Sequence, residues 1–258
     1  MTTRNREVRL LALGGVPLIR AGDDLCDIVL SALAHADEQL CAGDVVVIAQ
    51  KIVSKAQGRQ VHLDGIAPSA RALELAKVVQ KDPRVIELIL RESVEVLRTR
   101  RDVIVVEHRS GFVMANAGMD FSNIEAGAPD DSVLLLPVDP DGTCEQICAE
   151  LFERTQVRVA VIINDSHGRA WRNGSVGVAI GASGLPALQD LRGKPDLFGR
   201  PLRITQVGLA DELASAASVL MGQAAEGTPV ILIRGMEFDR HDGRAAELVR
   251  PKELDLFR

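Results

Sequence analysis

The chain has 258 residues, of which 47% are hydrophobic and 26% are charged, and its formal net charge is −6 at pH 7. This composition is typical of a globular protein with one large domain or two packed lobes. Basic clusters and aromatic platforms are scarce, with one Trp and no Tyr, which disfavours nucleic-acid binding. No apolar run approaches the ~20 residues of a membrane-spanning helix, so we expect no membrane partner.

The N-terminal sequence and the cysteines indicate the cellular compartment in which the protein resides. The first residues lack the apolar core and small-residue cleavage site of a secretory signal. The cysteines form no CxxC pair, and Cys144 and Cys148 have the i, i+4 spacing of a helix. We interpret all four, which include Cys26 and Cys41, as buried or reduced thiols. This predicts a cytoplasmic protein.

Helical periodicity alternates along the chain with runs rich in Val and Ile, which predicts a mixed α/β (α+β) fold. In chain order we expect a helix over 24–36, a strand over 44–49, helices over 68–80 and 83–97, strands over 102–107 and 132–138, a helix over 143–154, strands over 157–164 and 202–207, a helix over 211–221 and a strand over 229–234. The helical region over residues 68–98 differs in pattern from the strand-rich remainder of the chain. Two intimately packed lobes without a clean boundary fit this pattern.

Two segments place carboxylates after apolar runs. Residues 157–174 (VRVAVIINDSHGRAWRNG) begin as a buried strand that we expect to end at Asp165 and Ser166. Residues 111–123 (GFVMANAGMDFSN) repeat the arrangement and lead to Asp120. Mg²⁺ prefers oxygen ligands and commonly takes one or two carboxylates with substrate phosphates. The pair therefore predicts a metal site, and the alternative is that each Asp only caps a turn.

Two further segments fit phosphate binding. If the stretch after the strand at 44–49 is helical, Lys51, Lys55 and Arg59 present three cations on one face, although a solvated stripe is the alternative. The glycines at 222 and 227 permit close backbone approach to a ligand, although a glycine after a helix is also an ordinary C-cap. His167 has either a catalytic or a turn role.

Absent motifs narrow the chemistry. The sequence contains no GxxxxGK[ST] phosphate loop, no GxGxxG, no GxSxG elbow and no HExxH zinc helix. The remaining signals point to metal-assisted phosphate chemistry rather than covalent protein catalysis.

A series of motifs, taken together, resembles one family, coenzyme F420-0:L-glutamate ligase (F420:γ-glutamyl ligase). In chain order they are GGVPLIRAGDDL, QKIVSKAQGR, NAGMDFSN, LLLPVDPDG, INDSHGRAWRNG, GASG, DLFGRPL, ADELASAASVLMGQAAEG and VILIRGMEF. The match covers about residues 11–238, and the whole chain, 1–258, resembles the free-standing ligase domain.

The resemblance implies an α/β fold peculiar to this family, a homodimer, and addition of L-glutamate to coenzyme F420-0 with GTP and divalent metal. Mg²⁺ or Mn²⁺ is implied, with two divalent ions bound, and K⁺ is a further candidate. The carboxylate of F420-0 would be activated as an acyl phosphate, and successive γ-linked glutamates would follow. Hydrolysis of a nucleotide by water, or nucleotide binding by a regulator without turnover, are the alternative functions.

Site residues carried over by the resemblance fall into three groups. The nucleotide would contact Val16, Pro17, Leu18, Ile19, Gln50, Lys51, Lys55, Asn123, Met221, Gly222, Gln223, Ala224, Ala225, Glu226, Gly227 and Thr228. The metal ligands would be Asp120, Asp165, Ser166 and Gln223, and the catalytic residues Lys55, Asp165 and His167. Relatives carry Ser or Thr near Gln50 and Lys51 and an acidic residue at the position of Gln223. An amide oxygen there brings no charge, so a second metal would be held more weakly.

Overall fold

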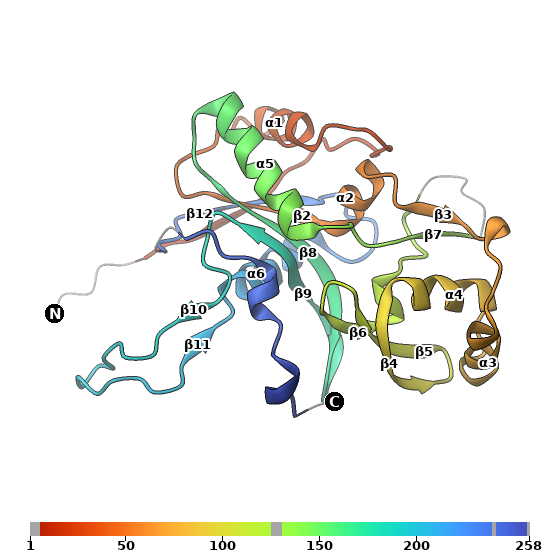
Figure 1. The fold of residues 1–258 in the computed structure, drawn as a ribbon. Helices are drawn as coiled ribbons and strands as arrows, with labels where there is room; N and C mark the ends of the chain where they lie inside the picture. Colours follow the sequence, from red (N-terminus) through yellow and green to blue (C-terminus); the bar gives the residue numbers. More distant parts are fainter. Residues whose placement is uncertain (1–5, 125–130, 239–240, 257–258) are drawn as a thin grey trace.

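A computed structural model describes residues 6–124, 131–238 and 241–256. The largest sheet has five strands in the order β1-β12-β2-β8-β9 (Figure 1). Their bounds are Arg9–Ala12 (β1), Val230–Arg234 (β12), Val45–Ala49 (β2), Ala160–Arg169 (β8) and Arg172–Ser183 (β9). β2 and β8 are parallel, whereas every other neighbouring pair in this sheet is antiparallel.

Helices cover both faces of this sheet (Figure 1). Val46 and Ile48 share a buried cluster with the helices α1 and α5, and the alternate residues Val45 and Val47 share another with α6. These helices span Leu25–His35 (α1), Pro140–Thr155 (α5) and Leu209–Met221 (α6). Because β2 is buried on both faces, its sequence is an unbroken apolar run.

A third buried cluster forms away from this sheet, between helices α3 and α4 and the smaller strands. A three-stranded sheet, β4-β5-β6, and the two-stranded pair β3-β7 belong to this region (Figure 1). The bounds are Gln60–His62 (β3), Ala70–Val79 (α3), Pro83–Arg91 (α4), Ser93–Arg100 (β4), Val103–His108 (β5), Val113–Ala115 (β6) and Ser132–Leu134 (β7). The mixed α/β class predicted from the sequence is confirmed.

The predicted helix over 83–97 was wrong in its second half. α4 begins at an Asp82 cap, whose side chain accepts from the Arg84 amide, and ends at Arg91. Ser93–Arg100 is instead strand β4, paired with β5. Its alternating Val and polar residues fit a half-exposed strand as well as a helix face, and pairing with the buried β5 decides between them.

The strand predicted over 157–164 was too short. β8 continues to Arg169, where it turns into β9, which the sequence analysis did not predict. β2 pairs only with residues 160–164 of β8, so beyond this point β8 and β9 form a two-stranded arm. The strand predicted over 202–207 shrinks to Gln206–Val207 (β11), which pairs with Gln189–Asp190 (β10).

Short helical segments complete the described chain. They are Gln50–Ala56 (α2), Leu63–Gly65 (η1), Asn116–Gly118 (η2), Ala245–Leu248 (η3) and Lys252–Leu254 (η4). All four cysteines are free thiols, with Cys26 and Cys144 buried, Cys148 half-buried and Cys41 exposed. None of the helices in the described ranges is long and apolar enough to cross a membrane.

Candidate functional site

The predicted site residues gather where β2 and β8 leave the sheet side by side. Ala49, the last residue of β2, pairs with Asn164 of β8. The chain after Ala49 enters α2 directly, and the residue after Asn164 is Asp165. Because the two strands are parallel, α2 and the Asp165 segment emerge at the same edge of the sheet.

Asp120 reaches this edge from the smaller sheet region. It follows η2 and pairs through its backbone with Leu134. Its Oδ2 accepts a hydrogen bond from Gln50 Nε2, and its Oδ1 lies 3.0 Å from Lys51 Nζ. Burial raises the pKa of Asp120, Lys51 opposes this shift, and the nearby Asp165 charge adds to it. Asp120 and Asp165 thus influence each other electrostatically.

Asp165 is held by a buried histidine. Its side chain is 12% exposed, and its Oδ2 lies 3.0 Å from His167 Nε2. The His167 ring also contacts Phe112 edge to face, with 6.3 Å between ring centroids. Asp165 and His167 are two residues apart on β8 and so share a face of the strand. His167 is thus placed to fix the orientation of the Asp165 carboxylate.

The loop after α6 joins the same site. Ser166 Oγ donates to Gln223 Oε1 at 2.8 Å, which places two predicted metal ligands in contact. Asn123 Nδ2 donates to the Ala224 carbonyl at 3.0 Å. These contacts bring residues 120–123, the β8 extension and the 221–228 loop together from three distant parts of the sequence.

The 221–228 loop is shaped around a carboxylate. Glu226 Oε2 accepts from the Ala224 amide at 2.8 Å, and backbone amides from Ala224, Glu226 and Gln223 lower the Glu226 pKa. Gly222 has a φ of +70°, and a Cβ there would clash with the Glu226 side chain. Thr228 Oγ1 donates to the Leu220 carbonyl at 3.0 Å and fixes the loop to the end of α6. The amides turned toward Glu226 are the kind of donors that bind phosphate in other loops.

Other predicted site residues lie around this centre. Lys55 is one turn along α2 from Lys51. The segment 16–19 precedes Gly22, whose amide donates to the Ala56 carbonyl at the end of α2, and it buries Ile19 while leaving Leu18 exposed. The contacts of the structure do not join this segment directly to the aspartates.

The predicted face of three cations was wrong. α2 ends at Ala56, so Arg59 lies beyond the helix. Its guanidinium pairs instead with Glu92 at 2.9 Å and donates to the Leu136 carbonyl. The i, i+4 spacing continued in the sequence, but the Gly58 turn ended the helix before the third cation. Lys51 and Lys55 remain as the cations that α2 supplies to the site.

Sequence analysis missed two polar residues of this site. Asn164, a buried residue beside Asp165, donates to Met221 Sδ, while its Oδ1 has no hydrogen-bond partner in the described ranges. Asp211 on α6 accepts from the Ala179 amide at 2.9 Å, and burial raises its pKa, which the nearby His167 opposes. A polar residue at the end of an apolar strand was a signal for Asn164, whereas Asp211 looked like an ordinary first-turn helix residue.

Comparison with known sequences places the chain in one family. The model of the F420-0:γ-glutamyl ligase family matches residues 15–235. The chain belongs to this family. It is 48% identical over 253 residues to the coenzyme F420:L-glutamate ligase of Methanothermobacter thermautotrophicus, covering 97% of this chain and 99% of that protein.

Two further relatives in this family carry the same name. The protein of Methanocaldococcus jannaschii is 44% identical over 258 residues, with full coverage of both chains. That of Methanopyrus kandleri is 47% identical over 255 residues, covering 96% of this chain and 98% of the relative. The resemblance stated from the motifs is thereby confirmed, and it extends over the whole chain.

The residues at this site fit the divalent cation that the ligase family implies. Asp120, Asp165, Ser166 and Gln223 offer only oxygen ligands, which suits Mg²⁺ or Mn²⁺. Repulsion between the two carboxylates is the charge excess that a cation relieves. Among the described residues, the compact group of carboxylates and thiol is a different one, Asp24 with Cys26 and Glu150, and Arg154 already pairs with both of its carboxylates. That group is satisfied as an ion-pair cluster.

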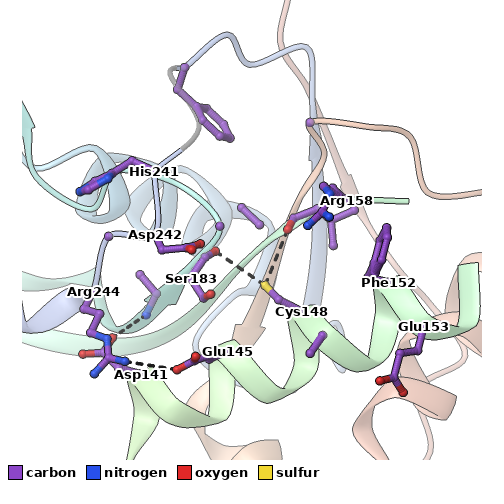
Figure 2. Close-up of a pocket in the computed structure, with 18 residues that line it drawn as sticks. Asp141, Glu145, Cys148, Phe152, Glu153, Arg158, Ser183, His241, Asp242 and Arg244 are labelled. Atoms are coloured by element: carbon purple, nitrogen blue, oxygen red, sulfur yellow. Dashed lines mark hydrogen bonds and ion pairs between the residues drawn. The ribbon is translucent and has the colours of Figure 1, made fainter. Parts of the chain in front are cut away.

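A large cavity lies elsewhere in this ligase-family fold. It has a volume of about 930 Å³ and is lined at the start of β2 and β8 by Gly43 and Ala160. Figure 2 shows Cys148 on α5 directed toward Ser183, and Arg244 toward Glu145. None of the predicted nucleotide or metal residues lines this cavity. The candidate site and the cavity therefore lie at opposite ends of the same strands.

Proposed function

We propose that this protein is a coenzyme F420-0:L-glutamate ligase that uses GTP and a divalent cation. The observation that carries the proposal is the convergence of Asp120, Asp165 and Lys51 on one sheet edge, together with membership of the family. The substrate named by the relatives is an acid, and a carboxylate must be activated before an amine can displace oxygen from it. A site that gathers cations and acidic ligands for a triphosphate supplies that activation.

The nucleotide would lie between α2 and the 221–228 loop. Lys51 and Lys55 would supply positive charge. The 221–228 loop would supply the backbone amides that now interact with the Glu226 carboxylate. The segment 16–19 and Asn123 would contact the guanosine portion. Asn123 is already fixed against the loop through Ala224, so its position is set before the nucleotide binds.

The reaction would proceed in two steps. The carboxylate of F420-0 attacks the γ-phosphorus of GTP, forming an acyl phosphate as the bond to the β-phosphate oxygen breaks and GDP leaves. The neutral amine of glutamate then attacks the acyl carbon, and phosphate leaves as the amide forms. Lys55 would stabilise charge on the transferred phosphoryl group, and holding both reactants in line supplies much of the rate. Repetition of the steps would add further γ-linked glutamates.

The metal would be held by Asp120, Asp165 and Ser166, with Gln223 toward a second ion and K⁺ as a further occupant. A bound divalent ion would neutralise phosphate charge during transfer. Lys51, now 3.0 Å from Asp120, balances the aspartate charge in the structure described. His167 would accept a proton from the glutamate ammonium, because its ring lies beside Asp165, with Nε2 3.0 Å from Asp165 Oδ2.

The proposal also includes two packed lobes, a homodimer and a cytoplasmic location. The third buried cluster, separate in its members from the two beside the large sheet, supports a division into lobes. Four free thiols fit a reducing compartment. Molecular mass in solution tests the dimer.

Mass spectrometry tests the reaction. Purified protein is incubated with F420-0, GTP, Mg²⁺ and L-glutamate, and the deazaflavin products are followed with GDP and phosphate. The proposal expects successive glutamyl additions, each with one GDP. GTP cleavage that is equally fast without F420-0 and glutamate would identify a phosphohydrolase instead. Absence of any GDP under all conditions would identify a binding protein.

A further inference from the structure

The two-stranded arm formed by β8 and β9 ends in an exposed tryptophan. Ala170 and Trp171 make the turn between Arg169, the last residue of β8, and Arg172, the first of β9. Trp171 is 87% exposed and is the only tryptophan in the chain. The same arm carries Asp165 at its base.

The backbone conformation of the turn does not favour a tryptophan at this position. Trp171 has a φ of +63°, a left-handed conformation that is uncommon for a bulky residue. The exposed ring also keeps a large apolar surface in water. Gly or Asn would satisfy the same turn at lower cost. Strain of this kind persists where the side chain has a task, and an exposed indole is suited to stacking on a flat aromatic ring.

The arm also carries an incompletely bonded cation beside the tryptophan. Arg169 Nη2 makes a long hydrogen bond, 3.4 Å, to the Asn173 carbonyl, while Nη1 is buried without a hydrogen-bond partner in the described ranges. Asn164 Oδ1 is likewise buried and has no hydrogen-bond partner in the described ranges. These two atoms lie on β8 between 164 and 169, on either side of His167, whose Nε2 lies 3.0 Å from Asp165 Oδ2. Buried polar atoms without partners mark a place where water or a ligand completes the bonding.

We propose that the β8–β9 arm binds the acceptor F420-0, with Trp171 stacked on the deazaflavin ring and Arg169 on the phosphodiester. This inference rests on the proposed function. The acceptor has its reacting carboxylate at one end, a phosphodiester next, then a polyol chain, and the tricyclic ring at the other end. The arm presents matching groups in the same order: the site at Asp165, the cation at Arg169 and the indole at Trp171.

Arg169 lies four positions after Asp165 on β8, which corresponds to ~13 Å between their Cα atoms at the usual rise per residue. Both residues belong to β8, whose pairing with β9 becomes irregular between Gly168 and Arg169. An extended acceptor lying along the arm would therefore place its carboxylate at the phosphoryl-transfer site while its ring reached the turn.

The sole tryptophan provides a direct binding assay. F420-0 is titrated into the wild-type protein without GTP, and tryptophan emission is recorded. Stacking predicts saturable quenching by F420-0, and none by GTP or by L-glutamate. Quenching that is absent, or emission that changes with protein concentration but not with F420-0, would overturn the proposal in favour of a contact between chains.

Variants test the same contact through kinetics. Trp171→Ala is expected to raise KM for F420-0 about tenfold, the equivalent of one stacking interaction, with KM for GTP unchanged, whereas Trp171→Phe keeps KM within about twofold. Arg169→Gln should act like Trp171→Ala. Phe198→Ala is the matched control, because Phe198 is an 88% exposed aromatic residue in the turn region beyond β10. An unchanged KM for F420-0 in Trp171→Ala would refute the inference.

The two proposals fail in different ways. If the wild-type protein binds F420-0 with quenching but adds no glutamate, the ligase function is wrong and the arm still binds the deazaflavin. If the wild-type protein ligates glutamate and Trp171→Ala does so with the same KM for F420-0, the ligase function stands and the arm has another role.

Discussion

The two ends of β2 and β8 differ in how their polar groups are bonded. At the cavity end, Asp141 accepts from the amides of Ala182, Ala245 and Ala246. Arg244 pairs with Glu145 at 3.2 Å, and Cys148 Sγ contacts the carbonyls of Val159 and Ser183 (Figure 2). At the other end, Asn164 Oδ1 and Arg169 Nη1 are buried without a hydrogen bond in the described ranges.

This difference indicates that buried polar atoms without hydrogen bonds are a better guide to the candidate site than the volume of a cavity. The cavity is large, but Asp141, Glu145 and Arg244 in its lining are already engaged in hydrogen bonds or an ion pair of the fold. The site end places two repelling aspartates beside a lysine and leaves polar atoms unbonded. Such an arrangement costs free energy in the folded protein unless a ligand completes it.

The largest expected effect on turnover comes from Asp165→Ala, at the end of the strands that carries the candidate site. Loss of this carboxylate removes one half of the acidic pair, and we expect GDP formation with F420-0 and glutamate to fall at least ~100-fold, since even residues that only support a metal ligand cost 10–100-fold. Circular dichroism should show a folded protein. Asp190→Ala, which breaks an exposed ion pair with Arg192, is the control and should keep full turnover. Wild-type rates for Asp165→Ala at saturating Mg²⁺ would remove the basis of the site.

A buried, well-paired charge should affect stability rather than turnover. Burial alone would raise the pKa of Glu92, but His108, Arg109 and Arg59 around it bring that pKa down to about 2. The stabilisation is present above the unfolded value of 4.5 and is lost as pH falls from there toward about 2. Glu92→Gln should therefore lower the free energy of unfolding by ~3 kcal/mol at pH 7.

Urea unfolding across pH 2 to 7 measures this effect. The difference between Glu92→Gln and wild type should shrink as the pH falls through the window, and turnover per folded molecule should stay near wild type. Glu95→Gln removes an exposed carboxylate 3.8 Å from Lys252 and serves as the control, with little change at any pH. A stability gap for Glu92→Gln that is independent of pH would contradict the assigned role of its charge.

Two glycines of β9 allow a matched pair of substitutions, one near each end of the strands. A Cβ on Gly177 would lie 2.4 Å from the Ala214 carbonyl oxygen and 2.5 Å from Asn164 Oδ1, and a Cβ on Gly181 would lie 2.5 Å from the Pro140 carbonyl oxygen. Each change to Ala should lower the free energy of unfolding by about 1–3 kcal/mol. Only Gly177→Ala displaces a group beside Asp165, so only it should also lower turnover per folded molecule. Equal turnover in both variants would place Asn164 outside the site.

The sequence was sufficient for the strands buried on both faces. β2, the first half of β8 and β12 are apolar without interruption, and helices on both sides explain that pattern. Asp165 was identified because it follows the apolar half of β8, and Asp120 because it follows the apolar residues of the segment 111–123. The residue pattern alone predicted a metal site at Asp120 and Asp165, whereas the nucleotide contacts and Gln223 were assigned from family motifs.

The predictions that were wrong or missing concern residues whose structure depends on partners far away in the sequence. The valines of β4 suit a helix face or a strand, and only pairing with β5 selects the strand. β9 is interrupted by glycines that lower its strand propensity, although they are required where α6 and α5 pack closely on it. Arg59 continued a cationic repeat, but its partner Glu92 is 33 residues away in the chain. Local patterns contain none of this information.

The smallest effect is expected at the cavity end, from Arg244→Gln. The variant loses an exposed ion pair with Glu145, which contributes less than about 1 kcal/mol, and the cavity remains lined by the same backbone. KM for GTP and for F420-0 should both stay within about twofold of wild type. A rise in either KM with unchanged stability would show that the cavity takes part in substrate binding, because the lost guanidinium has no bonding role at the aspartate end of the strands. That outcome would contradict the conclusion that substrates bind only at the aspartate end of β2 and β8.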